Sequence, residues 1–415
     1  MNKYIYTGLL ALVLILTSTH SFAKFTITPG IDVKGEYNDN IYLADTAKED
    51  DFITTLAPDI RLKYSPNSSL DLSLDYGLDL RNYSRHSNLS EETHRMEMSA
   101  SAKPFKRVFI DVADTYTRVP IDIRNKYASD NTITNMTDSN SFSVSTSVVL
   151  PVTTAISTTA GYNYSNLWFK DKGSTDSETH SVFFVLNDKF SSKITGALKY
   201  NYSAYRPNLT GQQGAVVEYD KHDGSVAINY QIASNFWVDG EMGESWIDFD
   251  NRDNSRMTFW NVGADYNLKI ISGSSIGINY SRSLNDSLTL GASRNDRSDL
   301  FLRAGNILKL TVNPYFSENT FINTDRKDKI KGINGDVSLP VSGKVTLLLN
   351  GLWEDQKFLP GEEKVRRHSL GCSFNYKLSS KMTAGVGYRY NRRNSNIDTE
   401  DFNNNIGWLQ AKVSF

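Results

Sequence analysis

Histidine is the residue best suited to acid–base chemistry near neutral pH, and five histidines follow residue 23 of this 415-residue chain. They are His86, His94, His180, His222 and His368. None lies in a recognisable nucleophile motif, and a Ser–His or Asp–His pair would have to be defined by geometry. The sequence holds no HExxH or CxxC motif, and residues 248–254, although rich in Asp and Asn, are too irregular for a calcium loop. The chain is therefore predicted not to be an enzyme and to carry no metal or cofactor.

Charged residues recur between apolar ones at even spacings, and this pattern indicates contact with water rather than catalysis. Eight of them share the polar phase of alternating segments: Asp71, Asp75, Asp79, Lys199, Asp239, Glu241, Asp265 and Arg389. A dry, unpaired charge carries a large desolvation penalty, so this face must meet water or opposite charges. The eight residues are predicted to line the aqueous lumen of a wide β-barrel.

The acidic residues Asp71, Asp75 and Asp79 allow two interpretations. As an acidic ladder, they would favour the passage of cations. Alternatively, they belong to a solvated wall and pair with Lys or Arg on neighbouring strands. The second arrangement is the more ordinary one and is preferred here.

The segments that position these charges alternate with a period of two. Residues 70–80 place leucine or tyrosine at every even position and polar residues or glycine at the odd ones. The same alternation recurs in residues 194–202, 226–232, 345–353, 370–378 and 384–390. A helix would space apolar residues three and four apart, which no segment after residue 23 does convincingly. The fold class is therefore predicted to be all-β.

Turn signals divide these segments in a regular way. Short breaks fall near residues 66–67, 104–105, 151–152, 191–192, 233–234, 272–273, 305–306, 342–343 and 379–380. Longer polar stretches lie between them, at residues 44–50, 120–140, 207–220 and 359–363. Outer-membrane barrels place short turns on one side and long loops on the other. The prediction is a single-domain transmembrane antiparallel up-and-down β-barrel over residues 24–415, with about 20 strands (range about 16–20).

Three prolines interrupt the predicted strands: Pro29, Pro58 and Pro314. Proline cannot donate a ladder hydrogen bond, and a closed barrel has no edge on which to place it. Bulges, or an irregular first strand pair, are expected at Pro29 and Pro58.

The chain ends on an amphipathic strand. Leu409, Ala411 and Val413 alternate with polar residues, and Phe415 is the last residue. Outer-membrane barrels usually end in this way, because the barrel-assembly machinery reads the C-terminal strand. Phe415 is therefore predicted to be an assembly signal and to lie beside the strand that begins near Phe25.

The first 23 residues have the features of a secretory signal peptide. Lys3 precedes an apolar run at residues 5–16, and Ser21, Phe22 and Ala23 fit small-x-small cleavage. Residues 24–415 would then fold outside the cytoplasm. The whole chain has a net charge of -2 and shows no basic face, so nucleic acid is not an expected partner. Its single cysteine, Cys372, falls in the apolar phase and cannot form a disulfide within the chain.

Aromatic residues make up 12% of the chain, and six of them come just before long loops. They are Tyr83, Trp168, Phe169, Tyr205, Trp246 and Trp353. Aromatic side chains commonly ring a membrane barrel at the level of the lipid headgroups. The six are predicted to form the outer aromatic girdle, with ordinary β-core packing as the alternative.

The first strands also carry a more specific pattern. Residues 36–41 read Glu-Tyr-Asn-Asp-Asn-Ile, followed by Asp-Phe-Ile-Thr-Thr at residues 51–55, the context of Pro58, and Leu-Arg-Asn-Tyr-Ser at residues 80–84. This region resembles a family of outer-membrane β-barrel porins, some associated with exosortase and exopolysaccharide loci. The resemblance covers roughly the first sixty residues after the signal and supplies no catalytic residue. It implies an outer-membrane barrel that serves polysaccharide export or secretion, and it implies that Pro29 and Pro58 are tolerated.

Two functions are expected from these features. The first is a passive porin-like channel in the bacterial outer membrane, which passes polar solutes or assists exopolysaccharide export. The second is a structural or docking barrel whose lumen is plugged by the longest loops, at residues 120–140 and 207–220. A barrel enzyme is a less favoured third. Expected partners are outer-membrane lipid, the barrel-assembly machinery and polysaccharide or small polar solutes.

Overall fold

The computed structural model describes residues 24–121, 136–171, 174–208, 217–250, 253–269, 272–287, 291–305, 307–322 and 324–415. The predicted signal peptide lies outside these residues. The first ten strands are β1 (Lys24–Asn38), β2 (Asp51–Asn67), β3 (Leu70–Tyr83), β4 (Glu91–Phe105), β5 (Val108–Pro120), β6 (Met136–Pro151), β7 (Ile156–Phe169), β8 (Ser177–Asp188), β9 (Ile194–Pro207) and β10 (Tyr219–Ala233). The others are β11 (Phe236–Phe249), β12 (Ser255–Leu268), β13 (Ser274–Ser287), β14 (Gly291–Ala304), β15 (Lys309–Phe321), β16 (Lys327–Pro340), β17 (Val345–Leu359), β18 (Glu363–Lys377), β19 (Met382–Ser395) and β20 (Phe402–Ser414).

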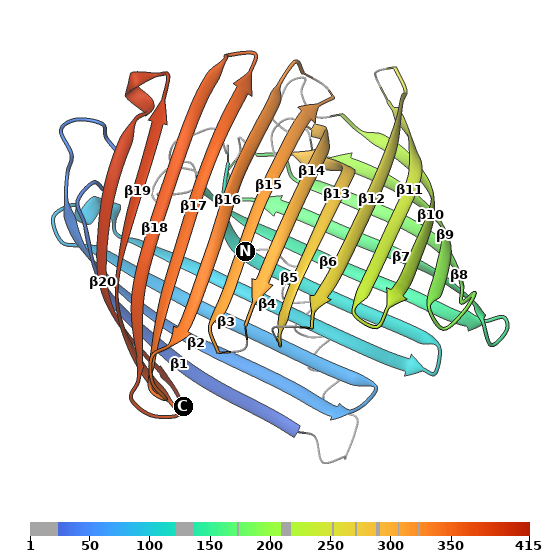
Figure 1. Ribbon diagram of the computed structural model, residues 1–415, viewed down its shortest axis with the longest axis horizontal. Coiled ribbons are helices and arrows are strands. Elements are labelled where there is room, and N and C mark those ends of the chain that lie inside the picture. Colours follow the sequence, from blue (N-terminus) through green and yellow to red (C-terminus); the bar gives the residue numbers. More distant parts are fainter. Residues whose placement is uncertain are drawn as a thin grey trace.

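The strands close into one barrel. Each strand pairs antiparallel with the next along the chain, and β1 also pairs with β20, from Gly30 opposite Ser414 to Asn38 opposite Ile406. Figure 1 shows the two walls crossing, with β1 to β9 behind and β10 to β20 in front. Every strand has a neighbour on both sides, which leaves no open backbone edge. The predicted all-β barrel with about 20 strands is confirmed, at the upper end of the expected range.

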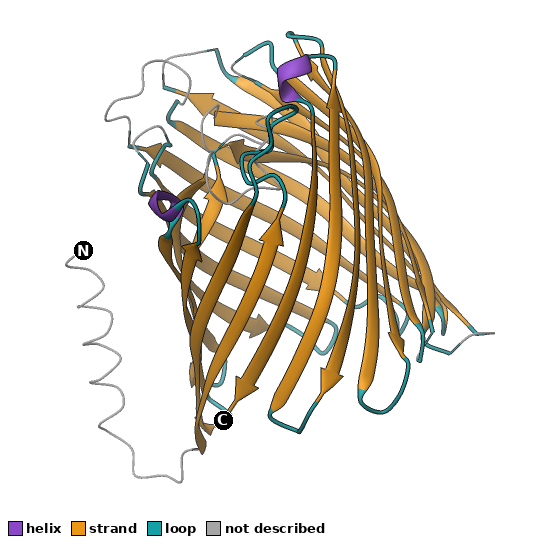
Figure 2. Cartoon of the chain, turned by 90° about the vertical axis from the view of Figure 1, so that its left-hand side faces the viewer, coloured by secondary structure: helices purple, strands orange, loops and turns teal. Residues whose placement is uncertain are grey.

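The connections differ at the two ends of the barrel. Short turns gather at the lower end in Figure 2, here called the turn end, and all nine predicted short breaks belong to it. Longer loops and the 3-10 helices η1 (Ser87–Leu89) and η2 (Asp398–Glu400) lie at the other end, the loop end. No helix among the described residues has the length and apolar content needed to cross a membrane.

Several of the short turns are organised by one hydroxyl group. The side chains of Thr153, Ser191, Ser342 and Ser379 each accept the N–H of the residue two positions on, at 3.1–3.3 Å. The same four residues donate their backbone N–H to the first residue of the next strand. This local bonding explains why Ser and Thr mark turns in the sequence, because their side chains compete with the strand ladder for backbone groups.

The prolines lie where a ladder bond is missing on one side only. Pro29 comes before the first pair that β1 makes with β20, and its carbonyl accepts the N–H of Phe415 at 2.9 Å. Pro58 pairs with Ile31 of β1, but the β2–β3 register lacks partners for Ala57 and Pro58. The β14–β15 register is likewise interrupted at Pro314. The barrel therefore accommodates each proline by giving up a local stretch of one ladder.

Candidate functional site

The candidate site is the inner surface of the barrel. The wall is a single sheet, and its most deeply buried strand side chains belong to one phase of the alternation. Ile247 is 0% exposed and Arg393 is 2% exposed, whereas Leu370 is 61% exposed. Large apolar side chains such as Leu198 and Leu409 share the outward phase with Leu370. The two phases of the alternation therefore form an apolar outer face and a largely polar inner face.

Two of the predicted lumen residues meet across a strand. Lys199 of β9 and Glu241 of β11 lie 2.7 Å apart at their charged atoms, although β10 runs between them. Ser225 of β10 donates to the other oxygen of Glu241, also at 2.7 Å. Side chains two strands apart converge in this way on the concave face of a curved sheet. Lys199 and Glu241 thus form part of a bonded polar row on the inner wall.

The three aspartates of β3 each have a partner. Asp75 bonds Arg61 at 3.0 Å and Asp71 accepts the hydroxyl of Ser65 at 2.8 Å. Asp79 lies 3.8 Å from Arg95. All three carboxylates remain on the solvated part of the wall, and their effect on passing ions stays a prediction.

The remaining predicted lumen residues lie beside glycines or aromatic rings. Asp239 covers Gly263 on the neighbouring strand, and Asp265 lies against Gly277. The guanidinium of Arg389 is 5.8 Å from the centre of the Trp408 ring. Sequence spacing assigned all eight residues to the polar phase, and the strand register assigns them to the same inner phase.

A feature that the sequence prediction missed is a set of aromatic rings that lie over glycines. In five places, ring atoms of an inward aromatic residue fill the position that a Cβ of the facing glycine would take. The pairs are Phe183 with Gly161, Phe259 with Gly243, Phe301 with Gly277, Tyr315 with Gly332, and Trp408 with Gly387. Each ring is half-buried. These rings lie down against the wall instead of projecting into the lumen, which is the geometry that glycine in a strand permits.

Cationic side chains accompany three of these rings. Arg303 lies 4.9 Å from the centre of Phe301, and Arg297 lies 5.3 Å from that of Tyr315. Lys34 lies 5.4 Å from the ring of Trp408. Such pairs are attractive, because the ring face carries partial negative charge. The inner wall therefore combines flat apolar surfaces with hydrogen-bond donors beside them.

The loop-end half of the inner wall is packed rather than open. Tyr205, Tyr219, Ile247 and Phe249 form one buried cluster. Farther round the barrel, Glu354 of β17 bonds Arg367 of β18 at 2.7 Å, and both residues are 9% exposed. Several other inward residues of this half, such as Phe169, Phe358 and Phe402, are also buried. Inward side chains of neighbouring strands thus pack against one another below the loops.

This packing corrects the predicted aromatic girdle. Tyr83, Phe169 and Tyr205 are buried on the inner face, so assigning them to the lipid headgroup level was wrong. Trp246 is on the outer face, where it is 42% exposed. The strand alternation could have predicted this, because residues an odd number of positions apart point to opposite faces. Tyr83 is three positions after outward Leu80, and Phe169 directly follows Trp168, so neither pair shares a face.

The loop between β1 and β2, residues 39–50, folds inward at the loop end. Ile41 and Leu43 are 2% and 1% exposed, and Ile41 packs against Ile53 and Tyr83 on the inner wall. Asn40, which is fully buried, bonds both the N–H and the carbonyl of Ala44 at 2.8 and 2.7 Å. The loop is therefore a folded cover over one part of the inner wall.

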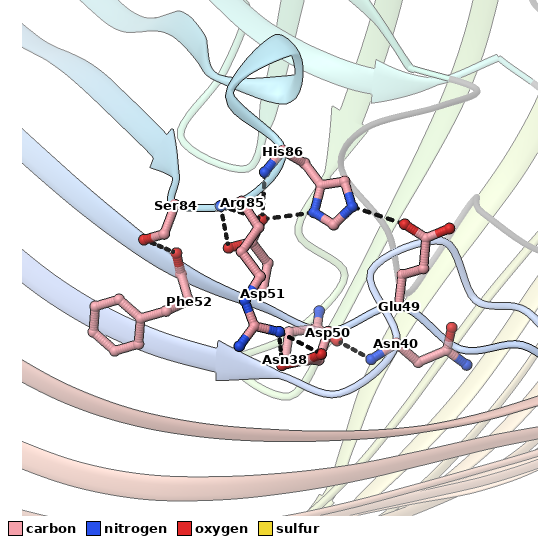
Figure 3. Close-up of polar contacts among 9 residues, drawn as sticks. All are labelled: Asn38, Asn40, Glu49, Asp50, Asp51, Phe52, Ser84, Arg85 and His86. Carbon is pink, nitrogen blue, oxygen red and sulfur yellow. Dashed lines mark hydrogen bonds and ion pairs between the residues drawn. The ribbon is translucent and has the colours of Figure 1, made fainter.

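A histidine between two carboxylates holds this loop to the next one (Figure 3). Nδ1 of His86 lies 2.9 Å from Asp51, and Nε2 lies 2.7 Å from Glu49. Asp51, which is 0% exposed, also accepts the backbone N–H groups of Arg85 and His86 at 3.1 and 3.0 Å. Arg85 bonds Asp50 at 2.7 Å. We call Glu49, Asp51 and His86 the latch.

The latch favours a protonated histidine. A neutral imidazole donates from one nitrogen only, whereas here both nitrogens face carboxylate oxygens. The hydrogen bonds to Asp51 and Glu49 accordingly raise the pKa of His86 above its ordinary value. Across the described residues, no group of three or more His, Cys, Asp or Glu side chains has the arrangement of a metal site. With His86 protonated, the latch consists of two ion pairs, from His86 to Asp51 and to Glu49.

Asparagines lock the seam between the first and last strands. Asn404 donates to Asn38 at 2.6 Å, and Asn40 donates to the carbonyl of Asn403 at 2.9 Å. Asn405 gives its backbone and side-chain N–H groups to Asp39, at 2.7 and 2.6 Å. The motif at residues 36–41 therefore supplies half of a clamp at the loop end of the seam. Sequence reasoning picked out this motif without finding its partner at residues 403–405.

Similarity to solved structures concerns the fold. The ferric enterobactin receptor PfeA from Pseudomonas aeruginosa is 8% identical with a TM-score of 0.54, over 94% of this chain and 80% of that one. The siderophore receptor PirA from the same organism is 10% identical with a TM-score of 0.51, at the same coverage. No protein-family model matches this chain, and no curated protein is significantly similar to it. The chain thus shares a β-barrel fold with these two receptors, and its resemblance to porins stays a prediction.

Proposed function

We propose that this chain is a passive outer-membrane channel for polar solutes and that saccharides are its favoured class. The observation that carries the proposal is the inner wall of the turn-end half. There, bonded charges such as Lys199 and Glu241 share a closed barrel with half-exposed aromatic rings. A wall of this kind is wetted by water and offers apolar contact at defined places.

Placement in a membrane follows from the outer face. In lipid every backbone polar group needs a partner within the protein, and the closed ladder from β1 to β20 supplies one. Exposed apolar side chains such as Leu198, Leu370 and Leu409 would be in contact with acyl chains. The predicted signal peptide and Phe415 add support for export and for assembly in the outer membrane. Phe415 lies beside β1, as expected.

The preference for saccharides rests on the rings over glycines. The C–H-rich face of a sugar ring packs well against a flat aromatic surface, and its hydroxyl groups can bond neighbouring charged side chains. Trp408, with Lys34 and Arg389 around it, has this combination. A role in exopolysaccharide export would agree with the family that the first strands resemble.

Recording from planar bilayers tests the channel directly. We expect the purified, folded barrel to conduct ions and saccharides to block that current reversibly. Replacing Trp408 with Ala should weaken the block, while the outward Trp353→Ala variant serves as a control for loss of an indole. A folded barrel without conductance would overturn the open channel, and equal block by both variants would overturn the role of Trp408.

A plugged docking barrel is the second candidate. It is favoured by one observation, the inward fold of residues 39–50, in which Ile41 packs against the wall and Leu43 is also buried. The loops originally predicted to form the plug, at residues 120–140 and 207–220, lie largely outside the described residues. Shortening residues 43–48 separates the candidates: a large rise in conductance indicates a plug, and unchanged conductance favours the open channel.

A further inference from the structure

Lysines gather on the outer face of three neighbouring strands near the loop end. Lys329 of β16 is directly opposite Lys357 of β17, and Lys357 is directly opposite Lys364 of β18. Directly opposed residues in an antiparallel pair have Cβ atoms about 4.5–5.5 Å apart, and like charges in these positions destabilise a sheet. A row of three lysines therefore needs anions nearby.

The carboxylates around this row are too few to supply them. We define the basic patch as the outward residues Lys327, Lys329, Lys331, Lys357, Lys364, Arg366 and Arg392. Two outward carboxylates meet it: Glu318 bonds both Lys327 and Lys329 at 2.9 Å, and Asp355 lies 3.4 Å from Lys331.

The neighbouring acidic residue Glu363 does not neutralise this excess positive charge. Glu363 is next to Lys364 in sequence, but it bonds Arg393 inside the barrel at 2.8 Å. Lys364, Arg366 and Arg392 are exposed. The basic patch thus presents uncompensated positive charge on the outer face of a chain whose net charge is -2.

The patch is a local feature of this wall. Comparable outward positions at the loop end of the opposite wall carry Glu92 of β4, Asp138 of β6 and Glu178 of β8. Attraction for anions is therefore expected to be stronger on β16–β19 than on β4–β8. It would not be a general property of the rim.

The position of the basic patch along the barrel axis indicates which part of the membrane it contacts. Below it on the same strands, toward the turn end, the outward residues are apolar, such as Ile333, Leu349 and Leu370. Trp353 and His368 lie side by side at the boundary. With the barrel placed in a membrane as proposed, and its long loops outside as in other outer-membrane barrels, the apolar band occupies the acyl chains and the patch lies at the headgroups of the outer leaflet.

We propose that the basic patch binds the phosphate groups of anionic lipids in the outer leaflet. Lysine and arginine are the usual ligands of lipid phosphates, and arginine can bind phosphate through two parallel hydrogen bonds. The lysine row would bridge neighbouring headgroups on one wall and fix the orientation of the barrel among its lipids. This proposal rests on the proposed function only for the placement in a membrane.

Lipid retention by the purified full-length barrel tests the proposal. The test variant combines Lys357→Gln, Lys364→Gln and Arg366→Gln. The control combines Lys193→Gln, Lys344→Gln and Lys381→Gln, three exposed lysines at the turn end with the same charge change. Titration of a bisphosphorylated glycolipid into detergent-solubilised protein, followed by native mass spectrometry, gives the apparent affinity. We expect at least a tenfold loss for the test variant and less than a twofold change for the control.

Two competition experiments identify the ligand. Zwitterionic phosphatidylcholine should not compete, and inorganic phosphate should compete only weakly if the lipid is the partner. Equal losses in both triple variants, or strong competition by inorganic phosphate, would overturn lipid binding. A change in oligomeric state of the test variant, with lipid affinity intact, would instead assign the patch to a second copy of the chain. Conductance is measured separately, so a failed channel and a failed lipid site are distinguishable.

Discussion

The two halves of the inner wall use the same twenty strands in different ways. In the turn-end half, inward charges such as Lys63, Asp71 and Asp75 are exposed. In the loop-end half, inward residues such as Ile247, Arg367 and Phe358 are buried, and Arg367 has a close carboxylate partner there in Glu354. The alternation along each strand determines whether a side chain points inward or outward. Packing of loops and long side chains determines how exposed the inner face is to solvent. The barrel is therefore an open wall at one end and a packed core at the other.

The largest test of this difference compares one ion pair from each half. Arg367→Ala would leave Glu354 buried without its guanidinium partner, and we expect a loss of about 3–5 kcal/mol in unfolding free energy. Lys199→Ala removes the partner of Glu241 on the solvated wall and should cost about 0–1 kcal/mol. Urea unfolding in detergent micelles, followed by gel mobility without heating, measures both. Similar losses of unfolding free energy in the two variants would show that the two ion pairs are equally exposed to solvent.

The seam offers a smaller test within one strand. Asn404→Ala removes buried hydrogen bonds to Asn38 and the carbonyl of Asn40, and should cost about 1–3 kcal/mol. Gln410, which bonds Asp32 at 2.5 Å farther toward the turn end, is the control; Gln410→Ala should cost about 0.5–1.5 kcal/mol. The same unfolding assay applies. A larger effect at Gln410 would contradict a loop-end clamp.

The latch should make the loop end sensitive to pH. Because the folded state raises the pKa of His86, its stabilising effect is complete below the ordinary value of 6.5. That effect is lost as the pH rises through the raised pKa. We expect residues 39–50 to become more accessible to protease at alkaline pH. His86→Gln should abolish this step, while His94→Gln, on the outer face, should preserve it.

The smallest effect on stability is expected at the solvated wall. Glu241→Gln keeps the shape of the side chain and leaves the Lys199 charge without its carboxylate. We expect unfolding to change by less than about 1 kcal/mol, with a measurable shift of reversal potential toward anions in a salt gradient. Asp355→Gln on the outer face is the control and should leave ion selectivity unchanged.

Much of the fold could be predicted because the alternation is a local property. Each strand shows its two faces in its own residues, and hydroxyl-containing turns such as the one at Ser342 separate strands visibly. The closure of β1 on β20 was also predictable, since the terminal strand ends on Phe415. The placement of the eight charged residues in one phase of the strands also followed from the alternation, and their role in lining an aqueous lumen stays a prediction.

The packed half could not be predicted in the same way. Tyr83 and Phe169 belong to residue types that suit either lipid or a core, and the sequence pattern near the loops was interpreted by composition rather than by phase. The latch joins Glu49 and the first residue of β2, Asp51, to His86 in the loop after β3, and the seam clamp joins residues 363 to 366 positions apart. Such contacts depend on how distant segments meet in space. The basic patch was missed because its charges come from four strands and alternate in the sequence with inward residues of mixed type.

The seam has a consequence for the order of events during biogenesis. Its hydrogen bonds join residues near the start of the barrel to residues near its end, so they are the contacts of highest sequence separation among the described residues. A chain that is still emerging, or one that has lost its last strand, has β1 without its partner and an open edge. The hydrogen bonds between Asp39 and Asn405 can therefore form only after the last strand has been synthesised and exported. Closure of the barrel thus requires the whole chain.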